Sequence, residues 1–261
     1  TININTPGGD NQDPSTPGNT SDPSIPSVDI DINKPDVDID INTPNIENPE
    51  ITIGIIKKEN LTVEDLNKLV EQIRVVDGWE TTEAYDRDKF EKPTKKFEFE
   101  GEKLTRNKYA WHISTWLIQN DETGFAYLDP YSGRIDADGK ITGLLITDTD
   151  KIDYDHIIPL QYTYYHGGYA WDDAKKNAYS YDIRVGVDVS STANRSKGAK
   201  GPSEWLPSEN QDDYCYTFFV IAADYDISMT TKDINVCKLQ ILNAISSNDP
   251  VGLINQTTLD E

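Results

Sequence analysis

The chain has 261 residues, of which 46 are acidic and 24 basic, so its formal net charge at pH 7 is −22. This length allows one good-sized domain with appendages. The charge excludes a general attraction to polyanions, because a negative field repels phosphate, and a nucleic-acid partner would need a locally basic surface. No stretch approaches the ~20 apolar residues of a membrane span, which excludes a transmembrane segment in this chain.

The first 50 residues form a low-complexity segment. They contain eight of the fourteen prolines and no aromatic residue, and a nine-residue unit rich in Asp, Ile and Asn recurs at 28–35 and 37–44. A segment with so few groups to bury cannot offset its chain entropy, and regular prolines keep it extended. We therefore predict a disordered tether over 1–50. Its alternating aspartates are a weaker indication of calcium binding, because calcium loops turn around the ion at a glycine.

The globular part is predicted to begin near Ile51. A Thr-x-x-Asp start and apolar residues at helical spacing predict a helix over 62–76. A second helix is expected over 105–119. The Asp-Gly pair at 138–139 lies between two short apolar runs, which is typical of a hairpin turn.

The second half alternates predicted strands and helices. Strands are expected at 143–146, 153–157 and 183–189, helices at 171–179, 212–225 and 231–246, and a short helix beginning near Asn194. The free N–H groups at the start of that short helix would favour phosphate.

The two cysteines, Cys215 and Cys237, fall in the last two predicted helices. They could form a disulfide or remain two buried thiols. A disulfide is the favoured interpretation; it would add ~3 kcal/mol and indicate an oxidising compartment outside the cytosol.

The residues that point to chemistry are Asp155, His156 and the distant Asn194. Carboxylate and carboxamide oxygens hold a hard divalent cation, and an imidazole can take the proton of an attacking water. Adjacent residues of a strand point to opposite faces, so we expect the Asp-His pair at a strand end or a twisted turn. The alternative interpretation makes Asp155 an ordinary salt-bridge partner and His156 a core histidine.

Several segments together resemble the secreted HNH-type nucleases, including the branch related to the C-terminal domain of GmrSD-type restriction enzymes. The segments are DYDHIIPL at 153–160, GGYAW at 167–171, ANRSKG at 193–198 and GPSEWLP at 201–207, with lead-in segments at 85–88 and 124–133. The resemblance covers residues 79–245. It implies Asp155 and Asn194 as ligands of one Mg²⁺ (or Mn²⁺) ion and His156 as the general base.

One residue of the family pattern is missing. The family has an asparagine in the second strand of its hairpin, which braces the loop that holds the histidine. Here Arg184 stands near that place, and Asn177 comes too early.

A basic segment surrounds the predicted ligand Asn194. Between residues 175 and 200, six basic residues face two acidic ones. Arg195, Lys197 and Lys200 are therefore expected to bind phosphate, although an ordinary solvated loop would have the same composition.

The sequence thus predicts an α+β fold with a ββα-metal (HNH, or His-Me finger) core and additional helices. The nuclease domain would span 51–261, with its motifs in 150–210. The expected function is a metal-dependent, largely sequence-nonspecific endonuclease acting on extracellular DNA, or RNA, as a monomeric domain that is secreted or tethered to a cell surface. The alternatives are a surface-display or adhesion protein with an inactive nuclease-like core, and a toxin or restriction nuclease domain.

Overall fold

The computed structural model describes residues 61–90, 96–99, 101–108, 114, 116–118, 126–135, 139–249, 251 and 254. The predicted tether and the predicted start of the domain near Ile51 lie outside these residues. The described chain combines helices with small antiparallel sheets, which confirms the α+β class. Its helices include none that is both long and apolar enough to cross a membrane.

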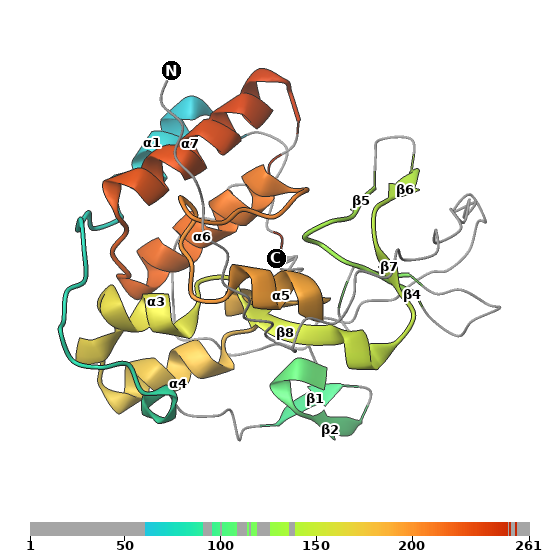
Figure 1. Cartoon of the computed structure of the whole chain (residues 1–261), viewed down its shortest axis with the longest axis horizontal. Helices are drawn as coiled ribbons and strands as arrows, with labels where there is room; N and C mark the ends of the chain where they lie inside the picture. Colours follow the sequence, from blue (N-terminus) through green and yellow to red (C-terminus); the bar gives the residue numbers. More distant parts are fainter. Residues whose placement is uncertain are drawn as a thin grey trace, which may run out of the picture.

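Three helices pack together on one side of the molecule (Figure 1): α1 (Val63–Val70), α6 (Gln211–Tyr225) and α7 (Thr231–Ser246). The last two match the predicted helices closely. Helix α6 supplies much of the core, including the completely buried Phe218 and Phe219.

Helix α1 begins as predicted and ends early. Its first turn has the capping box between Thr62 and Asp65, but the helix stops at Val70 instead of 76. The reason is tertiary: the Val76 amide donates to the Met229 carbonyl at 3.0 Å, and the Met229 amide donates to the Arg74 carbonyl at 2.9 Å. These backbone groups are thereby taken from any helical continuation.

The short strands form three sheets beside the helices. They are β1 (Phe97–Phe99) with β2 (Glu102–Leu104), β3 (Leu117–Ile118) with β4 (Ala126–Leu128) and β7 (Leu145–Ile146), and β5 (Arg134–Ile135) with β6 (Ile141–Thr142). The pairing of Ile135 with Ile141 confirms the predicted hairpin. The predicted helix over 105–119 is wrong at its end, because β3 pairs with β4 as a strand; residues 109–113 lie outside the described residues.

The centre of the molecule is a two-stranded hairpin followed by a helix. Strand β8 (Ile152–His156) pairs antiparallel with β9 (Gly186–Ser190), and α5 (Ser191–Lys197) follows β9 directly and packs on both strands. The Ser190 hydroxyl accepts from the Ala193 amide at 3.2 Å and so begins α5.

The connection between the two strands is helical. It contains α3 (Leu160–Tyr165), η3 (Gly168–Ala170), α4 (Asp173–Tyr181) and η4 (Ile183–Val185); two further single turns, η1 (Arg87–Lys89) and η2 (Thr149–Lys151), occur earlier in the chain. The strand predicted over 183–189 therefore starts only at Gly186. A side chain at Gly186 would lie 2.3 Å from the Tyr154 ring, so only glycine fits at this point of the hairpin.

Candidate functional site

Helix α5 is joined to strand β8 by two polar contacts. Because side chains alternate along a strand, Asp153 and Asp155 share the face that α5 covers. The Asn194 amide donates to the Asp153 carboxylate at 3.1 Å, and the Lys197 ammonium donates to the two Asp155 oxygens at 3.0 and 2.9 Å. Asn194 lies in the middle of α5 and not near its start, contrary to the prediction.

Asp155 is the centre of a buried polar cluster. Lys197 is completely buried, Asp155 is 5% exposed, and the Lys197 ammonium also donates to the His156 carbonyl at 2.6 Å. The Tyr131 hydroxyl donates to Asp155 Oδ2 at 2.6 Å. Burial raises the pKa of Asp155, which Lys197 and Tyr131 oppose, and burial lowers the pKa of Lys197, which Asp155 opposes.

In this arrangement Asp155 does not fit a divalent cation. Both its oxygens accept hydrogen bonds, and an ammonium group in direct contact would repel a second positive charge. Asn194 contacts Asp153 instead of Asp155. Within the part of the chain that the structure describes, no three His, Cys, Asp or Glu residues are grouped so as to hold a metal ion.

The base predicted from the sequence, His156, is the last residue of β8, so the expectation of a strand end is confirmed. However, both Asp155 and His156 belong to the ladder, and their side chains leave it on opposite faces. The His156 ring meets the ring of Tyr154, which shares its face, edge-on at 5.7 Å between centroids.

Positive charges surround His156. Burial lowers the pKa of its imidazole well below the usual range, and the charges of Arg106, Lys197 and Arg87 lower it further. The Arg106 guanidinium lies over the Tyr154 ring at 4.2 Å from the ring centroid. The imidazole is therefore neutral, as a general base must be, and the same burial and positive charges make it a weak proton acceptor.

The face that carries His156 also holds a carboxyl group that the sequence did not single out. Asp188 lies across the ladder from Tyr154, and burial raises its pKa to about 7, opposed by Arg106. Arg106 lies far from Asp188 in the sequence, and no motif around Arg106 predicted that it would contribute to this face. Tyr131, by contrast, lies within the lead-in segment 124–133 of the resemblance.

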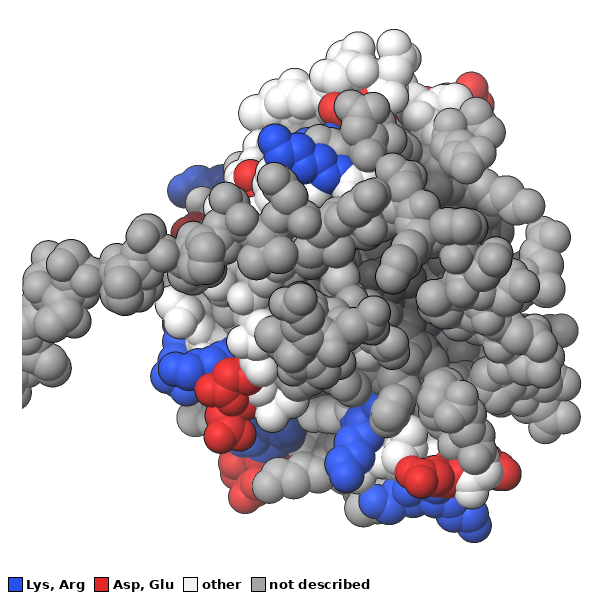
Figure 2. Space-filling view, turned by 90° about the vertical axis from the view of Figure 1, so that its right-hand side faces the viewer, with Lys and Arg blue, Asp and Glu red and all other residues white. Residues whose placement is uncertain are grey.

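The three predicted phosphate-binding residues have different surroundings. Arg195 and Lys200 are exposed, and the Lys200 ammonium donates to the Ser196 carbonyl at 2.8 Å. Lys197 is inside the protein, so the prediction that it meets phosphate at the surface does not hold for this arrangement. On the face shown in Figure 2, basic side chains lie beside acidic ones in several small groups.

Arg184 does not act as the bracing residue. Its guanidinium donates to Asp182 at 2.5 Å and to Asp224 at 2.7 Å, in the turn before β9. The backbone after His156 is held instead by the Ile157 amide, which donates to the Val185 carbonyl at 2.8 Å.

The predicted disulfide is absent. Cys215 in α6 and Cys237 in α7 are both free and buried. The two helices do bring them together, since burial and a hydrogen bond with Cys215 raise the pKa of the Cys237 thiol. The pair fills the space between the helices as two small apolar groups.

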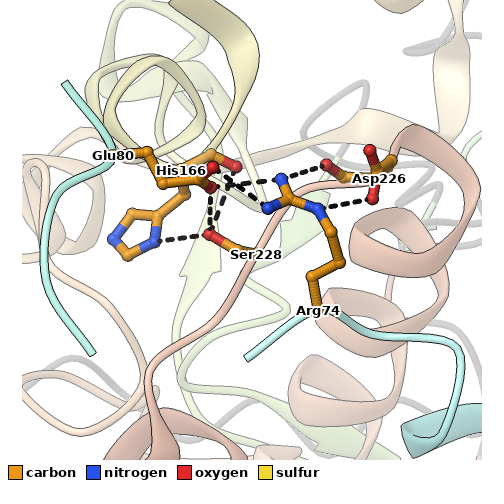
Figure 3. Close-up of polar contacts among 5 residues, drawn as sticks. All are labelled: Arg74, Glu80, His166, Asp226 and Ser228. Carbon is orange, nitrogen blue, oxygen red and sulfur yellow. Dashed lines mark hydrogen bonds and ion pairs between the residues drawn. The ribbon is translucent and has the colours of Figure 1, made fainter. Parts of the chain in front are cut away.

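The buried His166 has a structural environment. Its Nδ1 lies 3.2 Å from the Ser228 hydroxyl, and its ring stacks on Tyr162. Figure 3 shows the surrounding network, in which Arg74 bonds Glu80 and Asp226. These contacts fasten the segment after α1 to the loop between α6 and α7.

Comparison with known proteins adds one relative. The chain is 24% identical over 95 residues to an uncharacterized secreted protein of Arthroderma benhamiae. The matched region is 35% of this chain and 47% of that protein, so the match spans about half the length of the relative. No family model and no solved structure matches the chain.

Proposed function

We propose that this chain is a secreted HNH-type endonuclease that hydrolyses phosphodiester bonds of DNA, or of RNA. The observation that carries the proposal is the unit formed by β8, β9 and α5: two antiparallel strands, of which the second leads directly into a helix packed on both. Two of the segments that resemble the nuclease family, 153–160 and 193–198, begin on this unit, with His156 at the end of the first strand and 194–197 in the helix. The resemblance implies two antiparallel strands and a helix in this order, so their presence supports the proposal.

His156 would accept a proton from the water that attacks phosphorus. The cations that lower its pKa would attract a phosphate group, and the negative charge of that phosphate would raise the pKa of the imidazole and make it a better proton acceptor. The exposed Arg195 and Lys200 would contact neighbouring phosphates. Secretion is proposed because the Arthroderma benhamiae relative is described as a secreted protein.

One observation favours a second candidate, a surface protein with an inactive nuclease-like core. The Asp155 carboxylate, expected to hold the metal, is bonded to Lys197 and Tyr131. A protein that had lost the reaction could keep such a pair as a purely structural contact.

The deciding experiment measures cleavage of plasmid DNA, single-stranded DNA and RNA by the purified chain with Mg²⁺, with Mn²⁺ and with EDTA. His156→Gln should lower the rate by ~10²–10⁴-fold with an unchanged melting temperature. His166→Gln is the matched control: removing its contact with Ser228 should lower the melting temperature while the folded protein keeps its rate. Wild-type protein that cleaves no substrate under any of these conditions would support the inactive core instead.

A further inference from the structure

The face of β8 and β9 that carries His156 holds a hydroxyl group without a partner. The Tyr154 hydroxyl is buried and forms no hydrogen bond within the part of the chain that the structure describes. It lies over Gly186, because a side-chain carbon built there would be 2.5 Å away, and Gly186 is the ladder partner of His156. A buried donor without an acceptor lowers stability unless a ligand takes its hydrogen bond. The hydroxyl therefore marks a place beside His156 where an acceptor is missing.

A buried cation lies on the same tyrosine ring. Arg106 is 6% exposed, and its guanidinium lies 4.2 Å from the centroid of the Tyr154 ring. It donates to the Ser180 carbonyl at 2.7 Å and to the side-chain oxygen of Asn107 at 3.3 Å. Both acceptors are neutral, and among the described residues Arg106 forms no ion pair. A charge removed from water without an opposite charge in contact is costly, so this position favours an anion.

Two further charged groups act on this face. The positive charge of Arg87 also reaches the His156 ring. Asp188 lies across the ladder from Tyr154, and burial raises the pKa of its carboxyl group to about 7. Below that pH the carboxyl group is protonated, so it can donate a hydrogen bond to an anion and does not repel it.

We propose that Arg106 and Tyr154 form a seat for the phosphate group of the substrate next to His156. The guanidinium supplies the positive charge, and it and the Tyr154 hydroxyl donate hydrogen bonds to the phosphate oxygens. Tyr154 and His156 are only partly buried, so this part of the face is reached from solvent. The inference rests on the proposed function in naming a phosphodiester as the occupant. It gives the reaction two residues that hold the phosphate while His156 takes the proton of the attacking water.

Inorganic phosphate is the probe, because its binding can be measured on the full chain without cleavage. Proton–carbon NMR follows the imidazole signal of His156, which is identified as the signal absent from His156→Gln. At a pH below the pKa of Asp188, phosphate should shift this signal in a saturable manner. Arg106→Gln should abolish the saturable shift. Arg195→Gln, which removes an exposed arginine, is the matched control and should titrate as wild type does.

Tyr154→Phe separates binding from structure. Because the Tyr154 hydroxyl has no partner in the described chain, its removal should leave the melting temperature unchanged or raise it. The affinity for phosphate should nevertheless fall at least about tenfold, which corresponds to the loss of one hydrogen bond to a charged group. Tyr131→Phe is the matched control: its hydroxyl donates to Asp155 on the opposite face, so the variant should be less stable and bind phosphate as wild type does.

The possible outcomes separate this seat from the endonuclease. If phosphate left the His156 signal unchanged, or shifted it equally in wild type, Arg106→Gln and Tyr154→Phe, the seat would be overturned, and the cleavage assay would decide on the endonuclease independently. If Arg106→Gln did not fold, Tyr154→Phe would still decide. Saturable phosphate binding that depends on Arg106 and Tyr154 in a chain that cleaves no nucleic acid would support the seat and refute the endonuclease.

Discussion

Asp188 gives the most quantitative prediction, because its carboxyl group is buried on the His156 face of the hairpin. Its pKa is about 7 in the folded chain, against 3.8 for the free side chain. The folded state therefore keeps the proton to a higher pH than the unfolded state does. Between these two values the folded state binds more protons, so the free energy of unfolding falls as the pH rises.

The size of the effect follows from the same values. Each unit of difference between the folded and unfolded pKa changes the free energy of unfolding by ~1.36 kcal/mol. The free energy of unfolding therefore falls by about 4 kcal/mol as the pH rises, and this loss is complete above about pH 7. Asp188→Asn removes the titrating group and keeps the shape. The stability of the variant relative to wild type should therefore rise by about 3 to 4 kcal/mol between about pH 4 and about pH 8.

Urea unfolding followed by tryptophan fluorescence at the two pH values measures this difference, provided that the denaturant dependence is the same for both proteins. Ser190→Ala is the control on the same strand. It removes the cap of α5 but no titrating group, so it should lower stability equally at both pH values. If the difference between Asp188→Asn and wild type were the same at both pH values, the reasoning from burial would be refuted.

Three further predictions concern the cysteines, the tether and the basic residues. Protein that is unfolded without reductant and then alkylated should carry two alkyl groups, at Cys215 and Cys237, because both thiols are free. If its intact mass showed no added alkyl group, the two cysteines would form a disulfide instead. Deleting residues 1–50 should leave the melting temperature and the cleavage rate nearly unchanged, because the segment has few apolar groups to bury, and a large drop in melting temperature would show that it packs on the domain. The double variant Arg195→Gln/Lys200→Gln should weaken binding to duplex DNA equally for all sequences and reduce the slope of log affinity against log salt by up to two contacts of about 0.9 each, whereas an unchanged slope would place the DNA path elsewhere.

Local signals predicted much of the fold. The helix predicted over 231–246 coincides with α7, which Thr230 caps, and the Thr62–Asp65 box identified the start of α1. The Asp-Gly pair at 138–139 predicted the β5–β6 hairpin. These signals work because caps and turns depend on residues only a few positions away.

Distant partners decided where the predictions failed. Helix α1 does not reach residue 76 because the Arg74 carbonyl and the Val76 amide bond the backbone of Met229. β3 is a strand because β4 lies beside it. The candidate site has the same dependence: Asp155 bonds Tyr131, 24 positions earlier, and Lys197, 42 positions later.

By itself the sequence determined the α+β class, most of the helices and the position of His156 at a strand end. Only the tertiary structure decided that Lys197 is buried on Asp155, that His156 leaves the hairpin on the opposite face, and that the two thiols are free. The physical reason is that a charged side chain has no fixed place until the chain closes around it. Whether a lysine binds a phosphate in water or a carboxylate in the core depends on burial, which residues far apart in the sequence create together.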